Sequence, residues 1–179
     1  MARFSYTARM TKEFHPDRLD AKAFVLAGAR LEGHESLLKY ERLAQEAKGL
    51  HPDLRVDWVA VGEWRPEVGN EAGQLWMHLQ ARADFPMVCQ RCLGPVDVPL
   101  QVDQWFRFVA DEATAEALDD EVEEDLLALS REFDLHELIE DELLMALPLV
   151  PRHDECPDPV QLSASDEDFD SASAERPNP

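Results

Sequence analysis

The stretch QLWMHLQARADF, residues 74–85, alternates apolar and polar side chains, as a strand with one buried face requires. Its apolar positions are Leu75, Met77, Leu79 and Ala81. The same period of two runs through LRVDWVAVGEW, residues 54–64, and VDVPLQVDQWFRFV, residues 96–109. The connections between these stretches are short, whereas parallel neighbours need a crossover of about a dozen residues or more. The sequence therefore predicts three consecutive antiparallel strands.

Two further segments have the spacing of amphipathic helices. In HESLLKYERLAQEAK, residues 34–48, the leucines lie on one stripe, and Gly49 is placed to end the helix. In LHELIEDELLMAL, residues 135–147, Asp134 stands at the cap position and Pro148 ends the apolar face. Between them, DLLALS at residues 125–130 is typical of a short buried strand.

These elements predict an α+β fold with one domain and a tail. We expect an antiparallel sheet, open or curved towards a barrel, packed by two or three helices. At 179 residues the chain suits one domain, which we place at residues 1–157. Residues 158–179 are acidic and rich in Ser and Pro, which predicts a disordered tail. Residues 111–125 predict an acidic surface loop or a weak helix.

The net charge of −21 is concentrated in the second part of the chain. Residues 1–107 hold 14 Lys and Arg against 15 Asp and Glu, whereas residues 108–179 hold 3 against 23. A nearly neutral body can keep basic patches for RNA, while the acidic part repels RNA, holds a basic protein or only favours solubility. Few cysteines, no secretory signal and no long apolar run lead us to expect a cytoplasmic protein without a membrane segment.

Two short motifs carry potential metal ligands. Cys89 and Cys92 are separated by two residues, as are His153 and Cys156. Three thiolates and one imidazole form an accepted ligand set for tetrahedral zinc. Two interpretations stand: one structural zinc site made by all four residues, or reduced cysteines that shape a turn or face RNA without metal. A redox pair is disfavoured, because a strand follows the cysteines where a redox motif would begin a helix.

The rest of the sequence contains candidate binding residues but no catalytic motif. No nucleophile elbow, P-loop, dinucleotide fingerprint or His-Glu-x-x-His motif occurs, and the carboxylates of residues 135–147 are expected on a solvated helix face. We therefore expect a binding protein and not an enzyme. Arg91 could fork onto a phosphate, so Cys89, Arg91 and Cys92 are candidates for RNA or partner binding. The aromatic residues of the strands either pack in the core or stack on unpaired bases: Trp58, Trp64, Trp76, Trp105 and Phe106.

Two stretches are similar to signatures of the YceD family, the large ribosomal RNA subunit accumulation proteins. They are CQRCLGPVDVPL, residues 89–100, and FDLHELIEDELLMALPLVPRHDEC, residues 133–156, and the resemblance spans roughly residues 10–157. The family's cysteine turn falls on Cys89, Arg91 and Cys92, and its helix and proline signature falls on Asp141, Glu142, Leu147, Pro148 and Pro151. The chain departs from some relatives because it has no second cysteine cluster, which weakens the expectation of zinc.

The resemblance implies a ribosome biogenesis factor that supports synthesis, processing or accumulation of 23S ribosomal RNA. The expected partners are 23S RNA or its precursor, or large-subunit ribosomal proteins. An alternative is an acidic adaptor or chaperone that holds a basic ribosomal protein through residues 111–125 without direct RNA contact. A nuclease or RNA-modifying enzyme is disfavoured, since no acid and base pair or metal-binding carboxylate set stands out.

Overall fold

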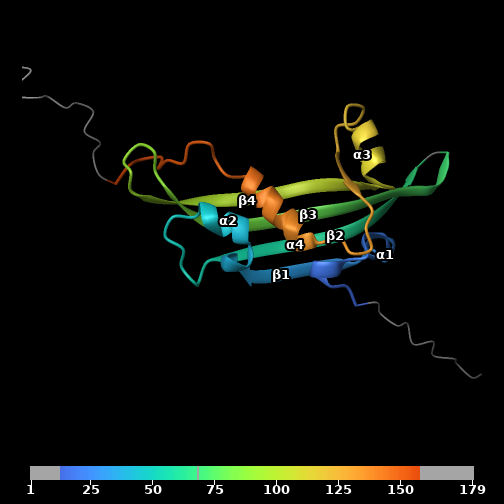
Figure 1. Ribbon diagram of the computed structural model, residues 1–179, viewed down its shortest axis with the longest axis horizontal. Coiled ribbons are helices and arrows are strands. Elements are labelled where there is room, and N and C mark those ends of the chain that lie inside the picture. The colour runs from blue at the N-terminus through green and yellow to red at the C-terminus, as the bar shows by residue number, and fades with distance from the viewer. Residues whose placement is uncertain (1–12, 68, 158–179) are drawn as a thin grey trace, which may run out of the picture.

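The computed structural model describes residues 13–67 and 69–157, which form a five-stranded sheet and short helices (Figure 1). The strands are β1 Arg30–Ser36, β2 Arg55–Glu67, β3 Asn70–Val88, β4 Pro95–Val109 and β5 Asp125–Ala128. The helices are α1 Ala21–Leu26, α2 Glu41–Glu46, α3 Glu112–Leu118 and α4 Leu135–Met145, with 3-10 turns η1 Pro16–Arg18 and η2 Leu37–Lys39. The mixed α+β class predicted from the sequence is confirmed.

The strands predicted from the period of two are β2, β3 and β4, and they pair antiparallel in sequence order. Alternation puts Met77, Leu79 and Phe85 of β3 in the core with no exposed surface, while Gln80 and Arg82 between them are exposed. β3 extends beyond the predicted residues 74–85 at both ends, whereas β4 begins only one residue before its predicted start. Together they carry the turn at residues 89–94 to one end of the molecule. This turn holds the first cysteine motif.

The fifth strand corrects one expectation and narrows another. β5 pairs with β4 in parallel, with Phe106 opposite Asp125 and Val109 opposite Ala128. The connection is residues 110–124, long enough for a crossover, and it includes the helix α3. The sheet is therefore not antiparallel throughout. Among the described residues it is open, with β1 and β5 as its edges, so it does not close into a barrel.

The predicted helix at residues 34–48 was also wrong in part. Residues 30–36 form β1, a 3-10 turn follows, and only Glu41–Glu46 are α-helical. The inward position at the middle of β1 is Gly33, where a Cβ atom would lie 2.5 Å from the ring of Trp58 on β2. The indole from the neighbouring strand fills the space that an apolar side chain of β1 would otherwise occupy. β1 is thus a strand with little apolar character of its own.

Helix α4 begins and packs as its sequence predicts. The Asp134 carboxylate accepts hydrogen bonds from the backbone N–H groups of His136 and Glu137, which are otherwise unpaired at the start of the helix. Leu135, Ile139 and Leu143 are fully buried against the sheet, each contributing about 1.5–3 kcal/mol by burial. Figure 1 shows α4 lying across the strands with α2 beside it.

Helix α1 covers the same face of the sheet. Gly62 of β2 makes this possible, since a Cβ atom there would lie 2.7 Å from the backbone Cα of Val25 in α1. The face is continuous with the buried residues of β3, because Gly62 is opposite Met77 in the register. We call the other side, which carries His78, Gln80 and the other outward residues of the strands, the uncovered face.

Some predictions fall outside the described residues. The disordered tail at residues 158–179 lies there, so the division of the chain after residue 157 stays a prediction. The acidic residues 111–125 are described: they hold the short helix α3, and all of them are exposed or half-buried. Within the described residues, every helix is too short or too polar to cross a membrane.

Candidate metal centre

The first cysteine motif forms a tight turn between β3 and β4. The backbone N–H of Cys89 donates to Gly94 O at 2.9 Å, and that of Leu93 donates to Cys89 O at 2.9 Å. Leu93 has a φ of 59°, in the left-handed region that disfavours side chains with a Cβ atom. This conformation folds the chain back after Cys92, so that both thiols can face the same side.

The second motif reaches this turn from the end of α4. Pro148 follows the helix, and the carbonyl of Pro151 accepts a hydrogen bond from Gln90 N at 2.8 Å. Arg91 holds the segment further along: its guanidinium donates to Cys156 Sγ at 3.1 Å, to His153 O at 2.9 Å and to Asp154 O at 3.1 Å. The side chain predicted as a phosphate fork thus has three acceptors within the chain.

The four predicted ligands converge. Cys89 Sγ lies 4.0 Å from Cys156 Sγ, and Cys92 Sγ lies 3.5 Å from His153 Nδ1. All four ligand atoms lie within 4.8 Å of one another. A tetrahedron with Zn–S of 2.3 Å has sulfur–sulfur edges of about 3.8 Å, and sulfur–nitrogen edges of about 3.6 Å. The two measured separations are close to these edges, so the Cys3His set could hold a metal ion such as zinc.

The electrostatics of the turn favour a thiolate at Cys89 and not at Cys92. A backbone hydrogen bond from Gly94 lowers the pKa of Cys92, but burial and the neighbouring thiols of Cys156 and Cys89 outweigh it and raise this pKa. Burial of Cys89 raises the pKa of its thiol, but hydrogen bonds from the backbone N–H groups of Cys92, His153 and Arg91 outweigh it, and the pKa falls to about 5. Metal binding requires the thiolate, because the protonated thiol is a poor ligand. The backbone of both motifs therefore prepares Cys89 for coordination before any ion arrives.

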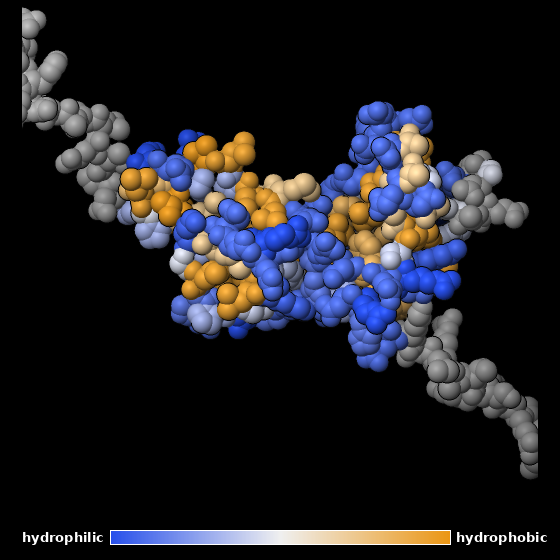
Figure 2. Space-filling view, viewed as in Figure 1, coloured by the Kyte–Doolittle hydropathy of each residue, from blue (hydrophilic) through white to orange (hydrophobic). Residues whose placement is uncertain are grey.

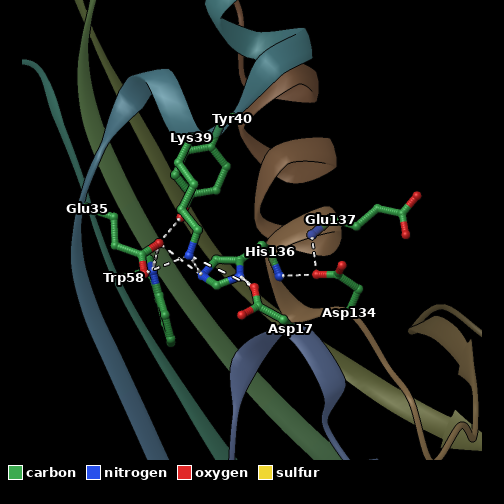
Figure 3. A network of polar contacts seen from close by, with 8 residues as sticks. All are labelled: Asp17, Glu35, Lys39, Tyr40, Trp58, Asp134, His136 and Glu137. Carbon is green, nitrogen blue, oxygen red and sulfur yellow. Dashed lines mark hydrogen bonds and ion pairs between the residues drawn. The ribbon is translucent and has the colours of Figure 1, made fainter. Parts of the chain in front are cut away.

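A second polar centre, which the sequence did not single out, surrounds His136 at the start of α4 (Figure 3). The imidazole Nδ1 lies 2.6 Å from Asp17 Oδ1, and Nε2 lies 2.9 Å from Glu35 Oε2 and 3.1 Å from Lys39 Nζ. Tyr40 and Trp58 also donate hydrogen bonds to Glu35. We call these six residues the His136 network.

Glu140, one helical turn after His136, is buried as well. Its carboxylate accepts hydrogen bonds from the backbone N–H groups of Arg42 at 2.8 Å and Leu43 at 3.1 Å, at the start of α2. The expected solvated position for Glu140 was therefore wrong. Glu140 lies four residues after His136 and on the same helical stripe as Ile139 and Leu143. This position was the signal in the sequence that its side chain is buried.

The strand aromatics divide between the two faces of the sheet. Trp58 and Phe106 belong to the core. Trp105 is opposite His78 on the uncovered face, and their rings stack with centroids 4.4 Å apart. The Arg65 guanidinium lies 4.2 Å from the Trp105 ring centroid and 4.4 Å from that of Trp76. Stacked aromatic and cationic groups therefore lie on the side of the sheet opposite the helices.

Comparison with known proteins adds one finding. Residues 77–179 match the family model described as "Large ribosomal RNA subunit accumulation protein YceD". The matched region starts within β3 and includes both cysteine motifs, the crossover through α3 and the helix α4. No solved structure matches the chain.

Proposed function

Because the chain belongs to the YceD family of large ribosomal RNA subunit accumulation proteins, we propose that it is a cytoplasmic ribosome biogenesis factor. In this role it supports the synthesis, processing or accumulation of 23S ribosomal RNA in the large subunit. The observation that carries the proposal is the family match, which covers more than half of the chain. The protein acts by binding and not by catalysis.

The Cys3His set holds one structural zinc ion. Two observations support this: the near-tetrahedral separations of Cys89 from Cys156 and of Cys92 from His153, and the thiolate character of Cys89. Four protein ligands complete a zinc tetrahedron, whereas a catalytic zinc keeps a position for water or substrate. The site then fastens the β3–β4 turn to the segment after α4, and Arg91 supports it from outside.

RNA contacts the uncovered face near Trp105. His78 stacks on the Trp105 indole and the Arg65 guanidinium lies over the same ring, so this cluster offers aromatic and cationic surface together to an unpaired base and its phosphate. This face carries charges of both signs on its strands, whereas the helical side carries the acidic residues 111–125. Phosphates are repelled less by a face of mixed charge than by an acidic one.

Depletion and sedimentation test the proposed role. Cells depleted of the protein are expected to accumulate less 23S RNA, and the protein is expected to travel with 23S precursors or pre-50S particles in a gradient. Unchanged 23S levels together with sedimentation only at the top of the gradient would contradict it. If the protein binds a basic ribosomal protein in a salt-sensitive way and no RNA crosslinks to it, the adaptor interpretation replaces direct RNA contact.

A matched pair of tryptophan variants tests whether RNA contacts the uncovered face. Trp105→Ala removes the indole of this cluster, and crosslinking to 23S RNA in cells is expected to fall about tenfold, as for loss of one stacked base. Trp64→Ala is the control. Trp64 is 44% exposed, but it is opposite Leu75 in the β2–β3 register and so lies on the other face of the sheet from Trp105. Equal crosslinking by both variants would move RNA contact away from this face.

A further inference from the structure

A groove lies between α3, β5 and the first half of α4, on the helical side of the molecule. Its volume is about 650 Å³, and its walls come from residues 110–112, 127–130, 132–134, 137, 138 and 141. Figure 2 shows the molecular outline indented between the α4 and α3 regions, with hydrophobic atoms beside α3 and hydrophilic atoms around them. Neither the cysteine motifs nor the uncovered face contributes to this groove.

The lining of the groove is partly apolar. Leu127, Leu129, Phe133 and Leu138 all line it, and each is half-buried, leaving part of its side chain accessible. Phe133 is held in place from behind by Phe108, edge to face, with ring centroids 5.6 Å apart. The apolar surface is therefore built on the core and is not a mobile fringe.

Carboxylates complete the lining. They are Asp111, Glu112, Glu132, Asp134, Glu137 and Asp141, and no Lys, Arg or His belongs to the lining. Four of them have partners within the chain: Asp111 and Asp134 cap helices, Glu132 pairs with Arg18, and Asp141 pairs with Arg42. Among the described residues, no cation pairs with Glu112 or Glu137. The groove therefore keeps a strong negative charge after the chain's own ion pairs are counted.

We propose that this groove docks a Lys- and Arg-rich segment of a partner protein that carries apolar anchor residues. Charge complementarity selects this occupant: the carboxylates attract cationic side chains, and the leucines receive the anchors. RNA is repelled by the same carboxylates, and a second copy of a chain with a net charge of −21 is disfavoured as well. This docking surface is separate from the RNA-binding face and goes beyond the proposed function.

The neighbourhood of the groove supports a cationic partner. Burial raises the pKa of Glu142, and repulsion from Asp125 and Asp141 raises it further. Like charges are thus crowded beside the groove without full compensation by the chain. A cationic segment in the groove would relieve this repulsion, which is an energetic reason for binding in addition to the apolar contacts.

Peptide binding to the full-length protein tests the proposal. The probe is a fluorescent synthetic peptide of Lys and Leu, with its leucines along one face of a helix. The double variant Glu112→Gln, Glu137→Gln is expected to weaken its binding roughly tenfold, as two exposed charge pairs are lost. The control, Asp84→Asn with Asp97→Asn, removes the same charge from exposed positions of β3 and β4, outside the groove, and is expected to bind as the wild type does.

Three outcomes would overturn the proposal. The first is an equal loss of binding in the groove variant and the control, which would mean diffuse charge attraction. The second is equal binding of a Lys-Ser peptide, which lacks apolar anchors. The third is a groove variant that changes the oligomeric state in sedimentation, which would assign the groove to a second copy. RNA crosslinking of the groove variant distinguishes this proposal from the RNA-binding role, because it should stay unchanged.

Discussion

Two histidines, one in the first turn of α4 and one in the segment that follows this helix, are held in opposite ways. His136, at the first turn, is 8% exposed, and both of its ring nitrogens meet charged groups of the chain itself. His153, beyond the last turn, faces three cysteines, whose thiols make only weak hydrogen bonds. The ring nitrogens of His136 find their partners within the chain. In the second centre, the three sulfur atoms and the imidazole could all serve as ligands to a metal ion. Burial and partners, more than residue type, decide which histidine is satisfied within the chain and which is available to a metal ion.

The two centres also join different parts of the fold. The His136 network ties α4 to η1 through Asp17, to β1 through Glu35 and to η2 through Lys39. The cysteine cluster ties the β3–β4 turn to the segment after α4. We therefore expect one centre to respond to metal and the other to acid, and four changes test this difference.

Loss of a metal ligand is expected to have the largest effect. Cys156→Ser should abolish zinc retention, because three ligands remain, and should lower the melting temperature by roughly 10 °C or more. A strong chelator should produce the same decrease in the wild type and almost none in the variant. The measurements are metal analysis and thermal unfolding of both proteins. Wild-type protein that contains no metal after zinc-supplemented expression would contradict the assignment.

Removal of the buried imidazole should be the next largest change. His136→Ala removes the buried partner that Glu35 and Asp17 share and leaves them only Lys39 in common, and we expect the free energy of unfolding to fall by about 3 kcal/mol. His34→Ala is the control, since His34 pairs with Asp57 on the exposed uncovered face, where ion pairs contribute little. Urea unfolding measures both variants. Zinc content should remain normal in each, and a loss of zinc in His136→Ala would show that the two centres are coupled.

Acid should weaken the His136 network by a smaller amount. Burial alone would raise the pKa of Glu35, but the hydrogen bond from Lys39 and attraction to His136 and Lys39 hold it below its ordinary value of 4.5. A carboxylate with a lowered pKa stabilises the fold above its unfolded pKa, and this contribution is lost as pH falls through the folded pKa.

The measurement is urea unfolding between neutral pH and a pH below 4.5. Because Glu35 is partly exposed, we expect its share of the decrease to be under about 1 kcal/mol. Asp57, Asp103 and Asp111 also have lowered pKa values, so Glu35→Gln is needed to isolate the share of Glu35. A variant with the same pH dependence as the wild type would remove Glu35 from the acid response.

The smallest expected effect is a gain. Leu93 adopts a left-handed backbone conformation while 74% exposed, so Leu93→Gly relieves strain and sacrifices little burial. The greater freedom of glycine in the unfolded chain offsets part of this, and we expect a net stabilisation of about 0.5 kcal/mol. Thermal unfolding of zinc-loaded protein measures it. A loss of stability would mean that the leucine side chain contributes to the cluster.

Local periodicity predicts the centre of this fold and misses its edges. β2, β3 and β4 follow from alternation, and α4 follows from its cap and its apolar stripe. β1 does not, because Gly33 leaves its inward position to the ring of Trp58, a contact that exists only after the strands pair. The parallel pairing of β5 is equally non-local, since it depends on the crossover through α3.

The candidate metal site shows the same division. The identities of Cys89, Cys92, His153 and Cys156 and their paired spacing were readable from the sequence. Their convergence was not, because it depends on the length of the β3–β4 hairpin and on the course of the chain after Pro148. Arg91 illustrates the difference further: its charge suggested a ligand outside the chain, whereas three acceptors from the second motif surround it.

The position of the cysteine cluster along the chain has one further consequence. Cys89 and Cys156 are 67 residues apart, and β4, α3, β5 and α4 all lie between them. A coordinated ion would make this stretch a closed ring, with fewer conformations open to it when the domain unfolds. Amide protons throughout the ring, and not only those next to the cysteines, should then exchange more slowly with solvent when the ring is closed.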